Sequence, residues 1–155
     1  MNRLLPYIIG ISLILFSGCV REAFIESDDS GEILTKRISV GMEEEFELGL
    51  GDTALIEVTK IEITFSFVSS DHRCPSDVVC ITAGEGVILL SYSDPFSTGR
   101  QIRATIPGLV PTPYLDNDIL RHNGNSIVLL RLDPYPESGV TRSPREYRAL
   151  LVVRS

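Results

Sequence analysis

The sequence lacks the features on which most enzymes and nucleic-acid-binding proteins depend. It contains no Gly-x-Ser-x-Gly elbow, no His-Glu-x-x-His motif, no phosphate-binding glycine loop and no cofactor fingerprint. Only 14 basic residues stand against 21 acidic ones, which gives a net charge of -7. Because phosphate binding requires clustered positive charge, this balance argues against nucleic acid as a partner. We therefore expect neither an enzyme nor a cofactor.

The chain also has no apolar run long enough for an ordinary membrane-spanning helix. The run Leu4–Phe16 has 13 residues, whereas a spanning helix needs about 20. It follows Arg3 and precedes the small residues Ser17 and Gly18, which is the basic, apolar and small-residue order of a secretory signal. We expect residues 1–18 to be a signal peptide. Two other outcomes are ordinary secretion without a lipid and a short anchor that is not cleaved.

The residues that end this leader, Phe16-Ser17-Gly18-Cys19, resemble the lipobox of bacterial lipoproteins, in which Leu is usual in place of Phe. The resemblance implies cleavage before Cys19, a diacylglyceryl group on its thiol and acylation of the new amino terminus. Two or three acyl chains anchor a protein almost permanently, whereas one holds it only marginally. Val20 in place of Asp implies, by resemblance to Gram-negative lipoproteins, the outer membrane, facing the periplasm or the cell surface. The membrane is thus the first expected partner, through the lipid.

Cysteine is scarce, and the count divides simply. With Cys19 assigned to lipid, Cys74 and Cys80 remain as an even pair. In an oxidising envelope such a pair normally forms a disulfide. It would close a short loop and stabilise the fold by roughly 2 to 2.5 kcal/mol on the chain-entropy estimate.

Two metal sites are weaker alternatives. A zinc site would use the only histidines with this cysteine pair, but Cys-x5-Cys is wider than the usual zinc-knuckle spacing. A calcium loop would need further oxygen ligands and a glycine where Ile119 and Arg121 stand. The residues concerned are His72, Cys74, Cys80 and His122 for zinc, and Asp116-Asn117-Asp118 for calcium. We expect no metal.

Polar composition and periodicity divide the exported chain. Residues 19–43 contain many acidic and few large apolar side chains, so they read as the lipidated cysteine followed by a solvated tether, with a candidate first strand at 33–40. From 44 to 155 we expect one domain. Its clearest strand is Lys60–Val68, because apolar and polar residues alternate along it. The residues expected on its core face are Ile61, Ile63, Phe65 and Phe67.

The other runs with strand character are short and are separated by turn residues. They are 46–50, 54–58, 86–92, 101–106, 126–132 and 147–153. With no long amphipathic helix between them, they predict an all-β protein, an antiparallel, immunoglobulin-like β-sandwich of roughly seven to eight strands. Ser143-Pro144-Arg145-Glu146 is a capping box with proline at the first helical position, so one short helical turn is expected near 144–147.

One segment resembles a group of uncharacterised bacterial secreted proteins and lipoproteins. It has the pattern D-x-R-C-P-x4-C-x3-G after an amphipathic strand, followed by a P-Y-P segment and a final Y-x3-L-x-V strand. The matching residues are Asp71, Arg73, Cys74, Pro75, Cys80, Gly84, Pro134-Tyr135-Pro136, Tyr147, Leu151 and Val153. Thr82 stands where that group often has an aromatic residue. The resemblance covers about residues 44 to 154 and implies a domain type without an activity.

The same segment is the candidate binding loop. Asp71 and Arg73 are two residues apart, so in an extended segment they would share a face and could either pair to orient the loop or recognise a ligand. As an exposed pair they would contribute only about 0 to 1 kcal/mol. The residues assigned to the candidate binding loop are Asp71, His72, Arg73, Pro75 and Gly84.

These features predict a lipid-anchored envelope protein that acts as a binding or structural module. The expected partner is a protein or an envelope polymer, and the contact surface is the loop that ends at Gly84. The alternative is a small envelope hydrolase or a protease inhibitor whose active loop the sequence does not identify. A hydrolase would need His72 or His122 beside a Ser or Asp within a concave pocket.

Overall fold

In the computed structural model, residues 35–109, 119–122 and 124–155 are described. The chain divides into two units, 1–32 and 33–155, and all described residues belong to the second. The leader, Cys19 and most of the expected tether therefore lie outside the described residues. The elements in order are β1 (Arg37–Val40), β2 (Glu45–Gly49), β3 (Thr53–Ile56), β4 (Ile61–Asp71), β5 (Glu85–Asp94), β6 (Ser97–Pro107), β7 (Ile119–His122), β8 (Asn125–Asp133), the 3-10 turn η1 (Pro144–Glu146) and β9 (Arg148–Arg154).

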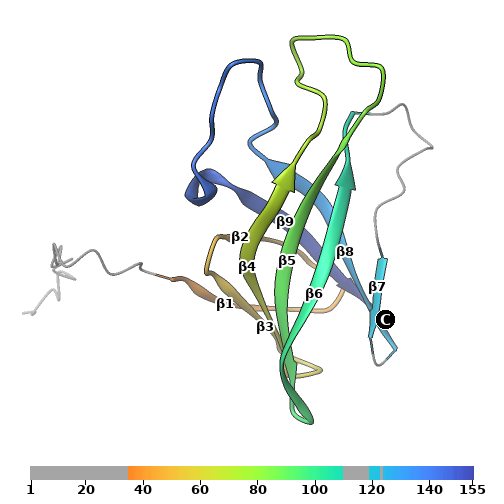
Figure 1. The fold of residues 1–155 in the computed structure, drawn as a ribbon. Helices are drawn as coiled ribbons and strands as arrows, with labels where there is room; N and C mark the ends of the chain where they lie inside the picture. Colours follow the sequence, from red (N-terminus) through yellow and green to blue (C-terminus); the bar gives the residue numbers. More distant parts are fainter. Residues whose placement is uncertain (1–34, 110–118, 123) are drawn as a thin grey trace, which may run out of the picture. The chain divides into compact units, whose positions relative to one another are not determined.

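The predicted β-sandwich is confirmed (Figure 1). One sheet has the order β1-β3-β4-β5-β6 and the other β2-β9-β8-β7. Strands that follow one another in the chain are neighbours from β3 to β6 and from β7 to β9. This order differs from that of the immunoglobulin sheets, in which many sheet neighbours are not consecutive in the chain. The described strand that the sequence did not indicate is β7, a four-residue partner of β8.

The pairing is antiparallel with one exception, because β1 pairs in parallel with β3. The two strands are separated by β2, which lies in the other sheet. A chain that leaves a sheet and returns to it makes a crossover, and a crossover is what a parallel neighbour requires. The first strand expected at 33–40 is thus present, but its direction was not predictable from alternation.

The core lies between the sheets and follows the predicted alternation up to one point. Ile61, Ile63 and Phe65 of β4 are almost fully buried, whereas Phe67 is 52% exposed. The pairing of β4 with β5 shifts register between Phe65 and Phe67. A bulge of this kind adds a residue on one strand and reverses which side chains face inward. The expectation that Phe67 faces the core was therefore wrong.

One end of the sandwich carries two long loops, β4–β5 and β8–β9, which lie side by side at the top of Figure 1. The Ser76 amide donates to the Pro136 carbonyl at 3.0 Å, and the Ser138 amide donates to a carboxylate oxygen of Asp77 at 2.9 Å. The predicted helical turn is present as η1, where a Glu146 carboxylate oxygen accepts the Ser143 amide at 2.8 Å. Within the described part of the chain, no helix combines the length and the apolar character that crossing a bilayer requires.

Candidate functional site

Asp71 and Arg73 form a buried ion pair at the end of β4. Their side chains are 6% and 2% exposed. The guanidinium Nε donates to Oδ1 of Asp71 at 2.8 Å, and Nη2 donates to Oδ2 at 2.7 Å. This two-pronged geometry is the strongest that Arg and carboxylate form. The pairing expected from the sequence is present, but its expected exposure was wrong, because the end of β8, the loop after it and Tyr147 pack around the pair.

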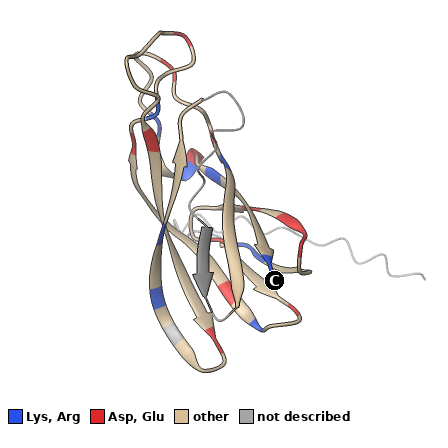
Figure 2. Ribbon diagram, turned by 90° about the vertical axis from the view of Figure 1, so that its right-hand side faces the viewer, with Lys and Arg blue, Asp and Glu red and all other residues tan. Residues whose placement is uncertain are grey.

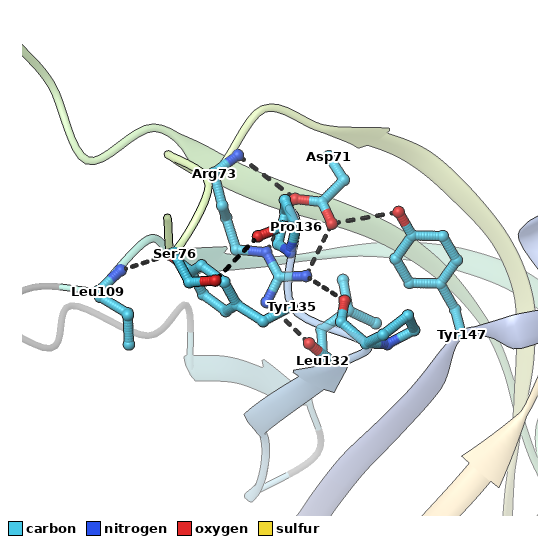
Figure 3. A network of polar contacts seen from close by, with 9 residues as sticks. Asp71, Arg73, Ser76, Leu109, Leu132, Tyr135, Pro136 and Tyr147 are labelled. Carbon is cyan, nitrogen blue, oxygen red and sulfur yellow. Dashed lines mark hydrogen bonds and ion pairs between the residues drawn. The ribbon is translucent and has the colours of Figure 1, made fainter. Parts of the chain in front are cut away.

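Arg73 also joins the two sheets (Figure 3). Its Nη1 donates to the Leu132 carbonyl at 2.7 Å, and Nη2 donates to the Pro134 carbonyl at 3.2 Å. The guanidinium carbon lies 4.6 Å from the centre of the Tyr135 ring, within cation–π distance. Leu132 belongs to β8 in the other sheet. One side chain therefore connects the end of β4 to the end of β8.

Tyr147, just before β9, completes this arrangement. Its hydroxyl donates to Oδ2 of Asp71 at 3.2 Å. Burial raises the pKa of the Tyr147 hydroxyl, and the negative charge and hydrogen bond of Asp71 raise it further. A tyrosine is neutral at ordinary pH even without this shift, so its hydroxyl acts as a donor to the carboxylate. We call Asp71, Arg73, Tyr135 and Tyr147 the arginine node.

The node supports the loop formed by residues 72–84, which the predicted disulfide closes. Cys74 and Cys80 are bonded, so the expectation for this pair is confirmed. At the base of the loop the Cys74 amide donates to the Ala83 carbonyl at 2.7 Å. Gly84 has a φ of +67°, and a Cβ built there would lie 1.9 Å from the His72 carbonyl oxygen. Gly84 thus permits a backbone approach that no other residue allows.

At the outer end of the loop, apolar side chains face solvent. Val79 and Ile81 are 101% and 105% exposed, and Val78 is 45% exposed. Leu109, two residues after β6, lines the same hollow as these residues and is 73% exposed. We call these four residues the apolar tip. Residues 78–84 contain no charged side chain, whereas neighbouring segments at the same end of the sandwich carry both acidic and basic residues (Figure 2). The loop also lines a hollow of about 290 Å³ together with Leu109 and Tyr135.

The residues of the candidate binding loop therefore divide into two groups. Asp71, Arg73 and Gly84 are supports, because the first two are buried and the third is required by the backbone. His72 is exposed, and Pro75 lines the hollow. The charged pair is thus not available as a ligand-recognising surface, which corrects that reading.

The apolar tip was missed in the sequence. The available signal was a run of aliphatic residues inside a loop closed by two cysteines, where polar residues are expected. Isolated exposed apolar residues are ordinary, but a cluster of them marks an interaction site.

The structure bears on the zinc site considered from the sequence, whereas the calcium loop lies outside the described residues. The bond between Cys74 and Cys80 occupies both sulfurs that a zinc site would need. Among the described residues, no three His, Cys, Asp or Glu side chains gather where they could hold a metal ion. Asp116-Asn117-Asp118 and the side chain of His122 lie outside the described residues.

No family model, no curated protein and no solved structure matches this chain.

Proposed function

We propose that the protein is a lipid-anchored binding module of the bacterial cell envelope, with the apolar tip as its contact surface. The observation that carries the proposal is the full exposure of Val79 and Ile81 on a loop that is closed by a disulfide. Burying an aliphatic side chain of this size is worth roughly 1.5 to 3 kcal/mol. The two side chains could therefore supply much of the affinity for a protein or an apolar region of an envelope polymer.

The bonds that hold the loop in one conformation favour a role of the apolar tip in binding. Binding costs less when the contacting segment is already held in its bound form. The Cys74–Cys80 bond, the Cys74 to Ala83 hydrogen bond and the arginine node each restrict the loop. Nothing in the described part of the chain favours the hydrolase alternative, so we propose binding rather than catalysis.

Replacing Val79 and Ile81 together by serine should lower the recovery of envelope partners at least about tenfold, because the apolar contact is lost. The measurement is quantitative mass spectrometry of proteins and polymers that co-purify with the tagged protein from envelope extracts. Val140→Ser is the matched control, because Val140 is 45% exposed on the neighbouring β8–β9 loop. Equal recovery with wild type and double variant would contradict the contact surface.

The anchor has a separate test, because Cys19 lies outside the described residues. Cys19→Ser should move the protein from the membrane fraction to the soluble fraction, since the acyl chains have no attachment point. The Cys74→Ser/Cys80→Ser variant, which also loses cysteine, should stay with the membrane. Mass spectrometry of the mature amino terminus should show an acylated Cys19. An unmodified amino terminus would refute the lipoprotein assignment.

A further inference from the structure

The loop segment that carries Val79 and Ile81 of the apolar tip has an unpaired backbone in the described structure. Within the described part of the chain, neither the amides nor the carbonyls of residues 79–82 make a backbone hydrogen bond, and these residues belong to no helix or strand. A lipid bilayer cannot pair such groups, and each unpaired group in hydrocarbon costs several kcal/mol. The tip therefore suits a protein cleft that pairs with a peptide backbone better than it suits a membrane.

The side chains add a second requirement for that cleft. Val79 and Ile81 stand on either side of Cys80 and are both fully exposed, on a segment that bends at Ile81 and Thr82. Cys80 between them is bonded to Cys74. A matching partner forms backbone hydrogen bonds with the segment and takes alternate side chains in apolar pockets. The substrate cleft of an endopeptidase has this construction, and its specificity pocket selects one side chain by size and charge.

The chain is held on both sides of the Ile81–Thr82 peptide bond, and both holds meet at Cys74. On one side Cys80 is bonded to Cys74, and on the other the Ala83 carbonyl accepts the Cys74 amide at 2.7 Å. Hydrolysis of the Ile81–Thr82 bond would place the hydroxyl of a water molecule on the Ile81 carbonyl carbon and its hydrogen on the Thr82 nitrogen. The two new ends would remain near Cys74. An ordinary substrate separates at this stage, whereas here the reverse reaction, which releases the water again, can compete.

We propose that this loop inhibits an endopeptidase of apolar specificity, with Ile81 in the specificity pocket and Ile81–Thr82 as the bond presented to the protease. The proposal rests on the binding function assigned above to the same tip and names the class of its partner. Residues 78–84 include no Lys or Arg, so a protease that requires a basic side chain is not the expected target.

The test is a titration of pancreatic elastase, subtilisin and trypsin with the purified full-length protein. Elastase or subtilisin, whose pockets are apolar, should be inhibited stoichiometrically, and trypsin should not. Ile81→Lys should weaken the inhibition of elastase and subtilisin on the order of 100-fold, because their specificity pockets are apolar. The same variant should inhibit trypsin, because the new lysine fits the acidic specificity pocket of trypsin. Ile81 is 105% exposed, so the thermal unfolding of the variant should match that of wild type. Val140→Ser should inhibit like wild type.

Long incubation gives a second measurement. A single cut at Ile81–Thr82 should accumulate slowly, and the two fragments should migrate together under native conditions and separate in denaturant. Cys74→Ser/Cys80→Ser should be cut rapidly, because one of the two holds is gone. Rapid degradation of the wild type would make the loop a substrate, and absence of both inhibition and cleavage would likewise overturn the inhibitor. If the inhibitor were overturned in this way but the Val79→Ser/Ile81→Ser variant still lost its envelope partners, the proposed binding function would stand without protease inhibition.

Discussion

Replacing Arg73 by alanine should lower the free energy of unfolding by about 3 to 5 kcal/mol, because it leaves a buried carboxylate without its counter-charge. Asp71 would retain only the Tyr147 hydroxyl among the side-chain donors that it now has. The carbonyls of Leu132 and Pro134 would lose the guanidinium as well. Urea denaturation followed by circular dichroism measures the change.

The matched control is Arg131→Ala. Arg131 pairs with Glu47 and Asp133, but its side chain is 56% exposed. Exposed pairs contribute about 0 to 1 kcal/mol, because water screens the charges. If the two arginine variants lost equal stability, burial would not be the source of the strength of the arginine node. Arg73→Lys should fall between them, because an ammonium keeps the charge but cannot donate in the same two-pronged way.

Replacing Gly84 by alanine should destabilise the protein by at least about 2 kcal/mol. The added Cβ would stand 1.9 Å from the backbone oxygen of His72, and the residue would keep a φ of +67°. Backbone cannot move aside as a flexible side chain can, so the base of the loop must open. The measurement is again chemical denaturation, together with inhibition or partner recovery as a readout of the tip.

Gly139→Ala separates the two causes. Gly139 has a φ of +72°, but a Cβ there would meet nothing within 4 Å. This variant should show only the conformational cost of a left-handed alanine, about 1 kcal/mol. A Gly84 variant no worse than the Gly139 variant would show that the close approach to His72 is not needed.

Local patterns in the sequence were sufficient for much of the architecture. Alternation along 60–68 located the longest central strand, the even pair Cys74 and Cys80 indicated the disulfide, and the capping box at Ser143 placed the 3-10 turn. These features depend on residues only a few positions apart. The sequence pattern did not predict the bulge that exposes Phe67, because the bulge arises in the pairing of β4 with β5.

Local sequence patterns were enough to predict a β-sandwich with a disulfide-closed loop, and both are present. Export and lipid anchoring at Cys19 stay predictions. The roles of Asp71, Arg73 and Gly84 in that loop became visible only from contacts between distant parts of the chain. Asp71 and Tyr147 are 76 positions apart, and Arg73 reaches Leu132 across 59, so no local pattern could bring them together. Their burial follows from the packing of the sheet ends. Because these residues support the loop from below, the contact surface that we propose is formed by Val79 and Ile81 at its tip.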